Sequence, residues 1–422
     1  MRPPAGPSVR VGLFGLLGSG NLGNDGSLEA VLGYLRRDHR DAVVDAMCGG
    51  PEVVRLRHRI PATRLHWYRG EYRTASRAGA VAGKGLGKLV DALRTAAWVR
   101  RHDVVIVPGM GVLEATLPLR PWGFPYALFL LCASGRLFGT RVALVGVGAG
   151  PVGNRATRTL VRWSARLAAY RSYRDTQSRD ALREMGVDTA GDPVHPDLAF
   201  ALPAPPAGPP SGTPGPVCVG VMDFHGGDDD RDRAEEIHRR YLDGTTRFVR
   251  ALVEDGRPVR LLTGDAVDAT VVASILDAVD SPLVTAAETA SLDELMREMA
   301  AADAVVATRY HNLVCALRVG VPTLALSYAA KSDALMELMG LGAYRHPARE
   351  ADADRLLERF RELEKHAAEL RQTLAERNLT VGRLLDEQFT ALTAAVFPGT
   401  GPTRAHAHTQ PHAHAHAPRE TP

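Results

Sequence analysis

Short apolar runs alternate with longer amphipathic segments along most of the chain, and turn residues separate the two kinds of segment. The apolar runs predict strands at 9–15, 42–47, 103–109, 141–149, 217–222, 259–264, 302–308 and 323–328. The amphipathic segments predict helices at 26–37, 122–139, 232–255, 268–279, 291–303 and 312–320. Continuous apolar strands separated by helices are typical of parallel sheets that helices cover on both faces. The pattern therefore predicts an α/β fold.

Two breaks in composition divide this pattern into domains. Residues 203–216, PAPPAGPPSGTPGP, form a Pro/Gly linker that can continue neither a helix nor a central strand. The polar, His-rich sequence of 397–422 predicts a disordered C-terminal tail. We therefore expect two doubly wound, Rossmann-like domains, an N-terminal one over 1–202 and a C-terminal one over 217–396. The second domain ends in a helical region at about 349–395, which we expect to pack across both domains.

Composition and charge exclude several classes of function. The chain has 422 residues, of which 45% are hydrophobic and 23% charged, as in soluble globular proteins. A net charge of +3 gives no support to nucleic-acid binding by the protein as a whole. The four cysteines are scattered without a C-x-x-C pair, which indicates a reducing compartment. No ligand set has the spacing of a metal site, the histidines of the tail included, so we expect no metal and no cofactor.

Membrane contact stays open as an alternative. The apolar stretch at 122–139 is too short to span a bilayer, so we expect a cytoplasmic protein with a buried helix there; contact at the inner face of the membrane is the alternative. Residues 55–101 carry twelve Lys and Arg against Glu71 and Asp91. This cluster is either a solvated face or a surface that attracts an anionic acceptor, such as a nucleotide sugar, a lipid pyrophosphate or an acidic membrane.

Glycine-containing loops follow three predicted strands of the first domain. The loop after the first strand, GLLGSGNLGNDGS, contains glycines that let backbone amides approach an anion, with a helix N-terminus following. Its polar side chains suit sugar hydroxyls, although a tight turn with a helix cap explains the same residues. The strand at 103–109 ends in PGMG, and the strand at 141–149 ends in GVGAGPVGN. Three such strand ends indicate close approach of a ligand to the backbone. The candidate residues are Gly20, Asn21, Gly23, Asn24, Asp25, Gly109 and Gly111.

Charged residues also stand at strand ends. Arg174 follows a short predicted strand, where it offers a planar fork suited to carboxylate or phosphate. Asp197 lies in a segment, 193–202, that we predict to be a Pro-bounded strand, and there it can simply cap a turn. Arg309 and His311, in TRYHN, lie between the strand at 302–308 and the next helix. The positive end of that helix favours anions, and an arginine beside a histidine suits an anionic substrate with a proton-transfer partner.

Four segments together resemble the polysaccharide pyruvyl transferase family, over about residues 10–345 and in the family's order. They are GSGNLGNDGSLEA (18–30), YRDTQSRDALREMG (173–186), HPDLAFAL (195–202) and TRYHNLVCALRVGVPTLALSYAAKSDALMELMGL (308–341). The last is the most specific, because it combines R-x-H after a strand, A-L-x-x-G-V-P and S-Y-x-x-K. Members of the family have two glycosyltransferase-B-like domains and transfer the pyruvyl group of phosphoenolpyruvate to sugar hydroxyls as a ketal.

The resemblance implies roles for individual residues. Arg309 and His311 match the family's R-x-H, which contacts phosphoenolpyruvate, and we expect both to be catalytic. Arg174 matches the donor-binding arginine of the R-D-x-x-S element, and Lys331 matches the family's lysine. With Tyr310, these residues form the expected donor site. The glycine loops of the first domain then form the acceptor site.

Departures from the family pattern lie in the N-terminal half. Asn24 stands where the family often has an acid, with Asp25 following, and PGMG replaces a G-G-G loop. The donor half therefore matches the family better than the acceptor half. We expect a sugar-containing acceptor in cell-surface polysaccharide or natural-product biosynthesis; an anionic or lipid-linked sugar, a natural-product sugar and another hydroxylated molecule all stay open. There are two alternatives. One is a nucleotide-sugar-dependent glycosyltransferase or epimerase, and the other is a non-catalytic protein that binds carbohydrate or lipid on the same scaffold. The acceptor's identity, the ketal's regio- and stereochemistry and the oligomeric state stay open.

Overall fold

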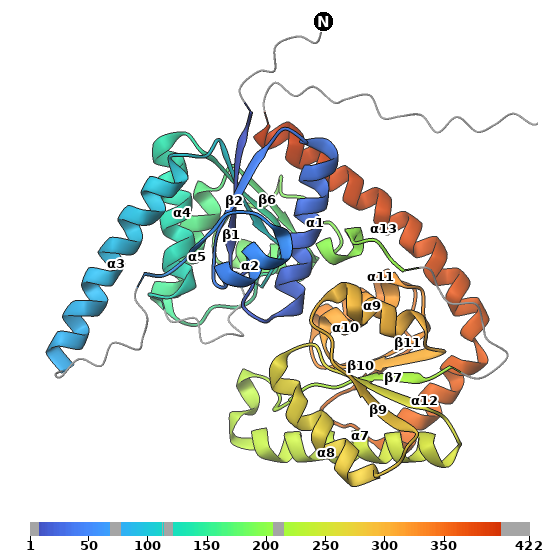
Figure 1. Cartoon of the computed structure of the whole chain (residues 1–422). Helices are drawn as coiled ribbons and strands as arrows, with labels where there is room; N and C mark the ends of the chain where they lie inside the picture. Colours follow the sequence, from blue (N-terminus) through green and yellow to red (C-terminus); the bar gives the residue numbers. More distant parts are fainter. Residues whose placement is uncertain (1–7, 68–76, 112, 114–120, 206–214, 398–422) are drawn as a thin grey trace, which may run out of the picture.

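The chain folds around two separate parallel sheets, each with six strands (Figure 1). The computed structural model describes residues 8–67, 77–111, 113, 121–205 and 215–397. The expected tail beyond Phe397 and the central part of the expected linker lie outside these residues.

The first sheet and its helices come from the N-terminal half of the chain. Its strands are β1 Arg10–Gly15, β2 Val43–Cys48, β3 Ala62–Arg64, β4 Val104–Pro108, β5 Arg141–Val147 and β6 Tyr170–Tyr173. Its helices are α1 Leu22–Asp38, α2 Pro51–His58, α3 Arg77–Val99, α4 Phe124–Phe138, α5 Arg155–Leu167 and α6 Thr176–Glu184. A 3₁₀ helix, η1 Leu198–Ala201, follows them.

The second sheet repeats the arrangement. Its strands are β7 Val217–Gly220, β8 Val259–Leu262, β9 Val284–Ala287, β10 Ala304–Ala307, β11 Thr323–Ser327 and β12 Arg345–Pro347. Its helices are α7 Ala234–Glu254, α8 Ala269–Val279, α9 Leu292–Ala300, α10 Tyr310–Arg318, α11 Ala330–Leu338, α12 Ala353–Lys365 and α13 Ala367–Val396. Two 3₁₀ helices, η2 Asp228–Arg233 and η3 Ala266–Asp268, precede α7 and α8.

Both sheets have the same doubly wound topology. The strand orders are β3-β2-β1-β4-β5-β6 and β12-β11-β10-β7-β8-β9, and the paired strands are parallel throughout. The order reverses between β1 and β4 in the first sheet and between β7 and β10 in the second. Central strands such as β4 and β10 are buried at every position, which explains their continuous apolar sequence. The predicted α/β class with two doubly wound domains is confirmed.

Local capping explains where several helices begin. The side chain of Asn21 accepts a hydrogen bond from the amide of Asn24, so α1 starts at Leu22, one turn before the predicted start. At α9, the hydroxyl oxygen of Ser291 accepts from the Glu294 amide, while the Glu294 carboxylate accepts from the Ala290 amide. Together these contacts cap the first turn of α9.

The predicted strand at 193–202 is wrong. Val194 makes one isolated bridge to Tyr173, and the chain then forms the short 3₁₀ helix η1. Pro193 and Pro196 have no amide hydrogen, so this segment cannot supply the regular donors of a strand. The carboxylate of Asp197 caps η1 by accepting from the Ala199 amide at 2.9 Å.

The long helix α13 runs along both halves of the molecule (Figure 1). In the first half of α13, the Asn378 side chain donates to the carbonyl of Leu317 in α10, at 2.8 Å. Near its end, the buried Gln388 side chain donates to the hydroxyl oxygen of Ser172 in β6, at 2.9 Å. The expectation that the C-terminal helical region packs across both domains is therefore confirmed. Among the described residues, we find no helix that is long and apolar enough to cross a membrane.

Candidate active site between the two sheets

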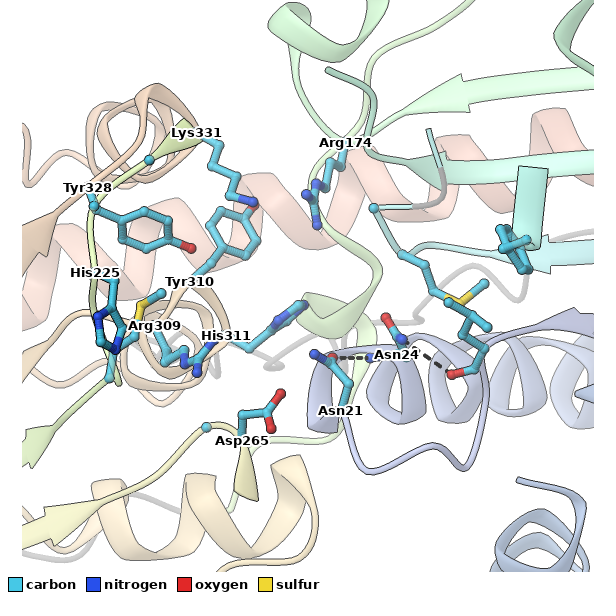
Figure 2. Close-up of a pocket in the computed structure, with 18 of the residues that line it drawn as sticks. Asn21, Asn24, Arg174, His225, Asp265, Arg309, Tyr310, His311, Tyr328 and Lys331 are labelled. Atoms are coloured by element: carbon cyan, nitrogen blue, oxygen red, sulfur yellow. Dashed lines mark hydrogen bonds between the residues drawn. The ribbon is translucent and has the colours of Figure 1, made fainter. Parts of the chain in front are cut away.

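A cavity of about 540 Å³ lies between the two domains, at the carboxyl ends of β1 and β4 on one side and of β7 and β10 on the other (Figure 2). These are the positions where the strand order reverses in each sheet, which is where doubly wound folds bind ligands. The lining residues that carry polar or aromatic side chains are Asn21, Asn24, Phe124, Arg174, His225, Arg231, Asp265, Arg309, Tyr310, His311, Tyr328 and Lys331. All five expected donor-site residues are therefore in one place.

Arg309 is held by a fully buried carboxylate. It lies directly after β10, and its guanidinium forms a two-point ion pair with Asp268, with Nε–Oδ2 at 3.0 Å and Nη2–Oδ1 at 2.5 Å. Asp268 also accepts the backbone amides of Asp223, Gly264 and Asp265. Burial alone would lower the pKa of Arg309, but its hydrogen bonds and charge attraction to Asp268 outweigh burial and raise it. The side chain is thus a fixed, permanently charged fork at the cavity wall.

Tyr310 lies next to the two other expected cations. Its ring centroid is 5.0 Å from the guanidinium carbon of Arg174 and 5.8 Å from the Lys331 ammonium (Figure 2). Arg174 comes from the end of β6 in the first domain, whereas Lys331 comes from the first turn of α11 in the second. The electron-rich face of the tyrosine therefore draws cations from both domains towards the same cavity. Tyr310 itself is buried, which fits a structural role for its ring.

His311 is placed by packing and by a carboxylate. It is in the first turn of α10, and its ring rests against Gly23 of α1, where a β-carbon would overlap the imidazole. The glycine is therefore needed so that the histidine of one domain can approach the helix of the other. The Nε2 atom of His311 lies 3.9 Å from Oδ2 of Asp197. The same Oδ2 atom lies 3.7 Å from Nη1 of Arg174. Asp197 thus connects the expected proton-transfer residue with an expected donor-binding arginine.

The expected acceptor residues separate into two groups. Asn21, Asn24 and Gly111 line the main cavity, opposite Arg309 and His311 (Figure 2). Gly20 and Asp25 line a second, smaller cavity of about 260 Å³.

The other glycines and Asp25 have clear structural roles. Gly109 has a φ of 51° and lies against Ser27, so it allows a turn and a close approach. The buried Asp25 carboxylate accepts the Gly18 amide at 2.6 Å, and burial raises its pKa although this hydrogen bond opposes the shift. The loop after β1 thus supplies asparagine side chains to the main cavity, while its acid stabilises the loop itself.

Several residues of the site were missed in the sequence. Asp268 lies four residues beyond the predicted strand at 259–264. Nothing in the sequence around it indicates that it pairs with Arg309, which is forty-one positions later. Arg231 lines the cavity from η2, and His225 from the loop after β7. His225 could have been considered, since it follows a predicted strand in MDFHGG as the other site residues do.

Solved structures with a similar fold include two UDP-GlcNAc 2-epimerases and MurG. A UDP-GlcNAc 2-epimerase from Neisseria meningitidis, bound to UDP-GlcNAc, is 11% identical over 92% of this chain and 99% of its own, with a TM-score of 0.59. The UDP-GlcNAc 2-epimerase from Methanocaldococcus jannaschii is 9% identical over 84% of this chain and 92% of its own, with a TM-score of 0.55. MurG from Acinetobacter baumannii is 12% identical over 92% and 99%, with a TM-score of 0.53. At such identities the likeness shows the glycosyltransferase-B-like fold alone.

Sequence comparison identifies the family. A search of curated proteins finds no match. The family model described as "Polysaccharide pyruvyl transferase" matches residues 21–329, most of the chain and all of the predicted donor residues except Lys331. This match begins at the N-cap of α1 and ends just before α11, so it includes the loops that form the cavity. The chain therefore belongs to the polysaccharide pyruvyl transferase family and is a transferase.

Proposed function

We propose that this transferase moves the pyruvyl group of phosphoenolpyruvate onto two hydroxyls of a sugar-containing acceptor, which forms a ketal and releases phosphate. The observation that carries the proposal is the convergence of Arg174, Arg309, Lys331 and His311 on one cavity between the domains. The family match supports the same reaction class.

The charge of the cavity suits a small trianion. Arg174, Arg231, Arg309 and Lys331 line it, and Asp265 is the one carboxylate among its described lining residues. Phosphoenolpyruvate carries a carboxylate and a phosphate at its two ends, so it needs cations at separate positions. Arginine binds both groups through charge-assisted hydrogen bonds, each of which contributes about 1.5–3 kcal/mol. Because Nε and Nη2 of Arg309 pair with Asp268, its Nη1 group is the proposed donor to the ligand.

His311 is the proposed proton donor to the methylene carbon of phosphoenolpyruvate. Its proton makes this carbon a methyl group and leaves positive charge on the neighbouring carbon, which the first acceptor hydroxyl attacks. The carbon–oxygen bond to phosphate then breaks, and the second hydroxyl attacks the same carbon. One of the two hydroxyl protons goes to His311 and replaces the proton that it gave to the methylene carbon. The other hydroxyl proton leaves with the phosphate. Such acid–base help is typically worth roughly 10²–10⁴ in rate.

The acceptor is proposed to enter from the first domain. Asn21 and Asn24 face the cavity opposite the donor residues, and their amides can both donate to and accept from sugar hydroxyls (Figure 2). The hydroxyls would then approach the donor carbon from the side of α1.

Calorimetric titration with phosphoenolpyruvate tests the donor. We expect binding by the unaltered chain and at least about tenfold weaker binding by Arg309→Gln and by Arg174→Gln. Arg183→Gln is the matched control, because Arg183 is an exposed residue of α6 that pairs with Asp180, away from the cavity lining. His311→Asn is expected to abolish phosphate release in the presence of glycan acceptors.

Two results would contradict the proposal. Tighter binding of UDP- or GDP-sugars than of phosphoenolpyruvate would identify a nucleotide-sugar enzyme on the same fold. Glycan binding without any pyruvylated product, followed by mass spectrometry, would indicate a carbohydrate-binding protein.

A further inference from the structure

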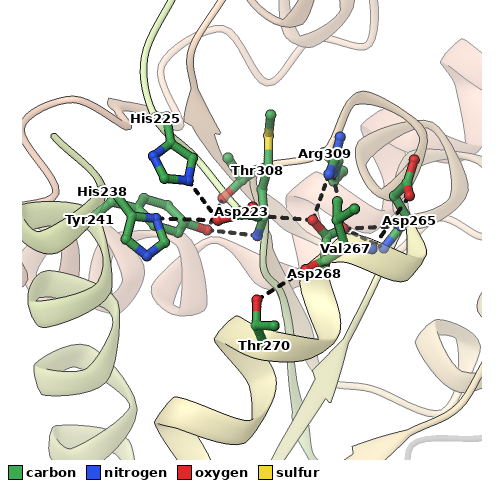
Figure 3. A network of polar contacts seen from close by, with 12 residues as sticks. Asp223, His225, His238, Tyr241, Asp265, Val267, Asp268, Thr270, Thr308 and Arg309 are labelled. Carbon is green, nitrogen blue, oxygen red and sulfur yellow. Dashed lines mark hydrogen bonds and ion pairs between the residues drawn. The ribbon is translucent and has the colours of Figure 1, made fainter. Parts of the chain in front are cut away.

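We propose that Asp223, His225 and His238 form a binding site for one divalent transition-metal ion of the zinc class, at the edge of the main cavity. Asp223 and His225 belong to the loop after β7, and His238 belongs to the first turns of α7 (Figure 3). All three side chains are half-buried, and one donor atom from each lies within 4.8 Å of the others. This inference does not depend on the proposed donor.

The distances around the Asp223 carboxylate fit a metal site. Its Oδ1 atom is 3.0 Å from Nε2 of His225 and 3.4 Å from Nδ1 of His238. Donor atoms around a tetrahedral zinc ion, with bonds of about 2.0–2.2 Å, are about 3.3–3.6 Å apart. The distance from Asp223 to His238 therefore already has the separation that a shared ion requires, and the distance from Asp223 to His225 is slightly shorter.

Hydrogen bonding alone does not account for the cluster. His225 donates to the carboxylate, but Nδ1 of His238 is buried and has no hydrogen-bond partner among the described residues, although it lies beside the same oxygen. A buried ring nitrogen without a hydrogen-bond partner, next to a carboxylate and a second imidazole, is a polar atom that a bound metal ion would satisfy.

A modest side-chain movement would complete the site. The two imidazole rings are stacked, with centroids 4.4 Å apart and planes within 9° of parallel. Lone pairs in parallel rings do not converge, so one ring must turn for both nitrogens to bind one ion. The side chain of His225 is 40% exposed, against 23% for His238, so His225 has the room to turn.

The donor set selects the class of ion. Two imidazole nitrogens and one carboxylate suit zinc and its neighbours, whereas magnesium and calcium prefer oxygen ligands. Three protein ligands leave a position open for a ligand oxygen, and His225 lines the main cavity. The Asp223 amide donates to Asp268, the residue that holds Arg309, so the proposed ion site and the arginine share one rigid support (Figure 3).

Metal titration of the full-length chain tests this site. To exclude metal binding by the histidines at 406, 408, 412, 414 and 416, these residues are first replaced by serine in every protein tested. In this background we expect one equivalent of Zn²⁺ by calorimetry, and intense visible absorption with Co²⁺ as the sign of tetrahedral coordination. Asp223→Asn and His238→Gln should each remove both signals, while circular dichroism shows that the fold is kept.

His366→Gln is the matched control, because His366 lies at the end of α12 beside Glu362, away from the cluster. It should bind one equivalent like its parent. The proposal is overturned if the parent shows no stoichiometric binding, if Asp223→Asn and His238→Gln bind as well as the parent, or if His366→Gln loses binding equally. In those cases the cluster is a hydrogen-bonded support for the loop.

Discussion

At the scale of single residues, Asp268 determines how the site holds its charge. Asp268 is fully buried. Its two carboxylate oxygens accept hydrogen bonds from the Arg309 guanidinium and from three backbone amides. A buried carboxylate that accepts this number of hydrogen bonds is held in one position and fixes the guanidinium that it binds. Arg309 therefore keeps its orientation without a ligand, and little side-chain entropy is lost when an anion binds.

Asp268→Asn should weaken the use of the donor and leave the acceptor unaffected. The amide keeps the size of the side chain but turns one acceptor into a donor that faces other donors, so Arg309 loses part of its support. We expect kcat/KM for phosphoenolpyruvate to fall roughly 10–100-fold, as for the loss of one charge-assisted hydrogen bond. Steady-state kinetics with both substrates varied measures this effect.

The exposed Asp277→Asn, on the neighbouring helix α8, is the control and should behave as the unaltered chain. A rise in KM for the acceptor alone would show that Asp268 does not act through Arg309.

At the scale of elements, strand-to-helix junctions carry both function and stability. The junction from β10 to α10 places Arg309, Tyr310 and His311 at the cavity, while that from β12 to α12 has a structural task. There the buried His346 accepts the Asp352 amide on Nε2 at 3.3 Å, and the Asp352 side chain caps α12 by accepting the Arg355 amide. Burial is the main cause that lowers the pKa of His346. This imidazole is therefore neutral in the folded chain.

The free energy of unfolding should consequently fall on mild acidification. The unfolded chain takes up a proton on residue 346 near pH 6.5, whereas the folded chain does so only at lower pH, so stability is complete above this range and is lost as the pH decreases through it. His346→Gln should be less stable at pH 7.5 and should show a smaller pH slope between pH 7.5 and 5. Urea denaturation at several pH values measures both. An identical slope in the two proteins would show that His346 does not contribute.

At the scale of the whole molecule, the site exists only while the two domains keep their contact. Helix α1 of the first domain packs against α9 of the second. Gly26 allows this contact, because a β-carbon there would overlap the side chain of Leu292. The helix α13 adds a second connection through Asn378 and Gln388.

The larger side chain of Gly26→Val should therefore clash with Leu292 and push the two domains apart. Overpacking of this kind costs about 1–3 kcal/mol, and it should lower both thermal stability and turnover because the cavity widens between its donor and acceptor walls. Gly33→Val is the matched control: it lies on the same helix and has open space around it. Differential scanning calorimetry and activity of the two variants should differ clearly. Equal effects would mean that only helix propensity had changed.

The amino-acid sequence by itself determined the class of fold and identified a set of residues that line one cavity. Apolar runs between amphipathic helices predict parallel doubly wound sheets, because buried strands and half-buried helices need those periods. Arg174, Arg309 and His311 could be singled out because they stand just beyond strand ends, where such folds bind ligands. The family resemblance added Lys331 and Tyr310 to this predicted donor site. The segment at 193–202 was mispredicted because its apolar residues resemble a strand while its prolines prevent one.

Only the tertiary structure decided which residues from distant parts of the chain support the site residues. The packing of different elements brings Asp268 beside Arg309, Gly23 against His311, and Asp223 beside His225 and His238. The spacing of these residues along the chain does not predict the contacts. The roles of the residues in the loop after β1, which we expected to bind the acceptor, could not be told apart from the sequence either. Burial and the path of the backbone assign Asn21 and Asn24 to the cavity and Asp25 to the interior.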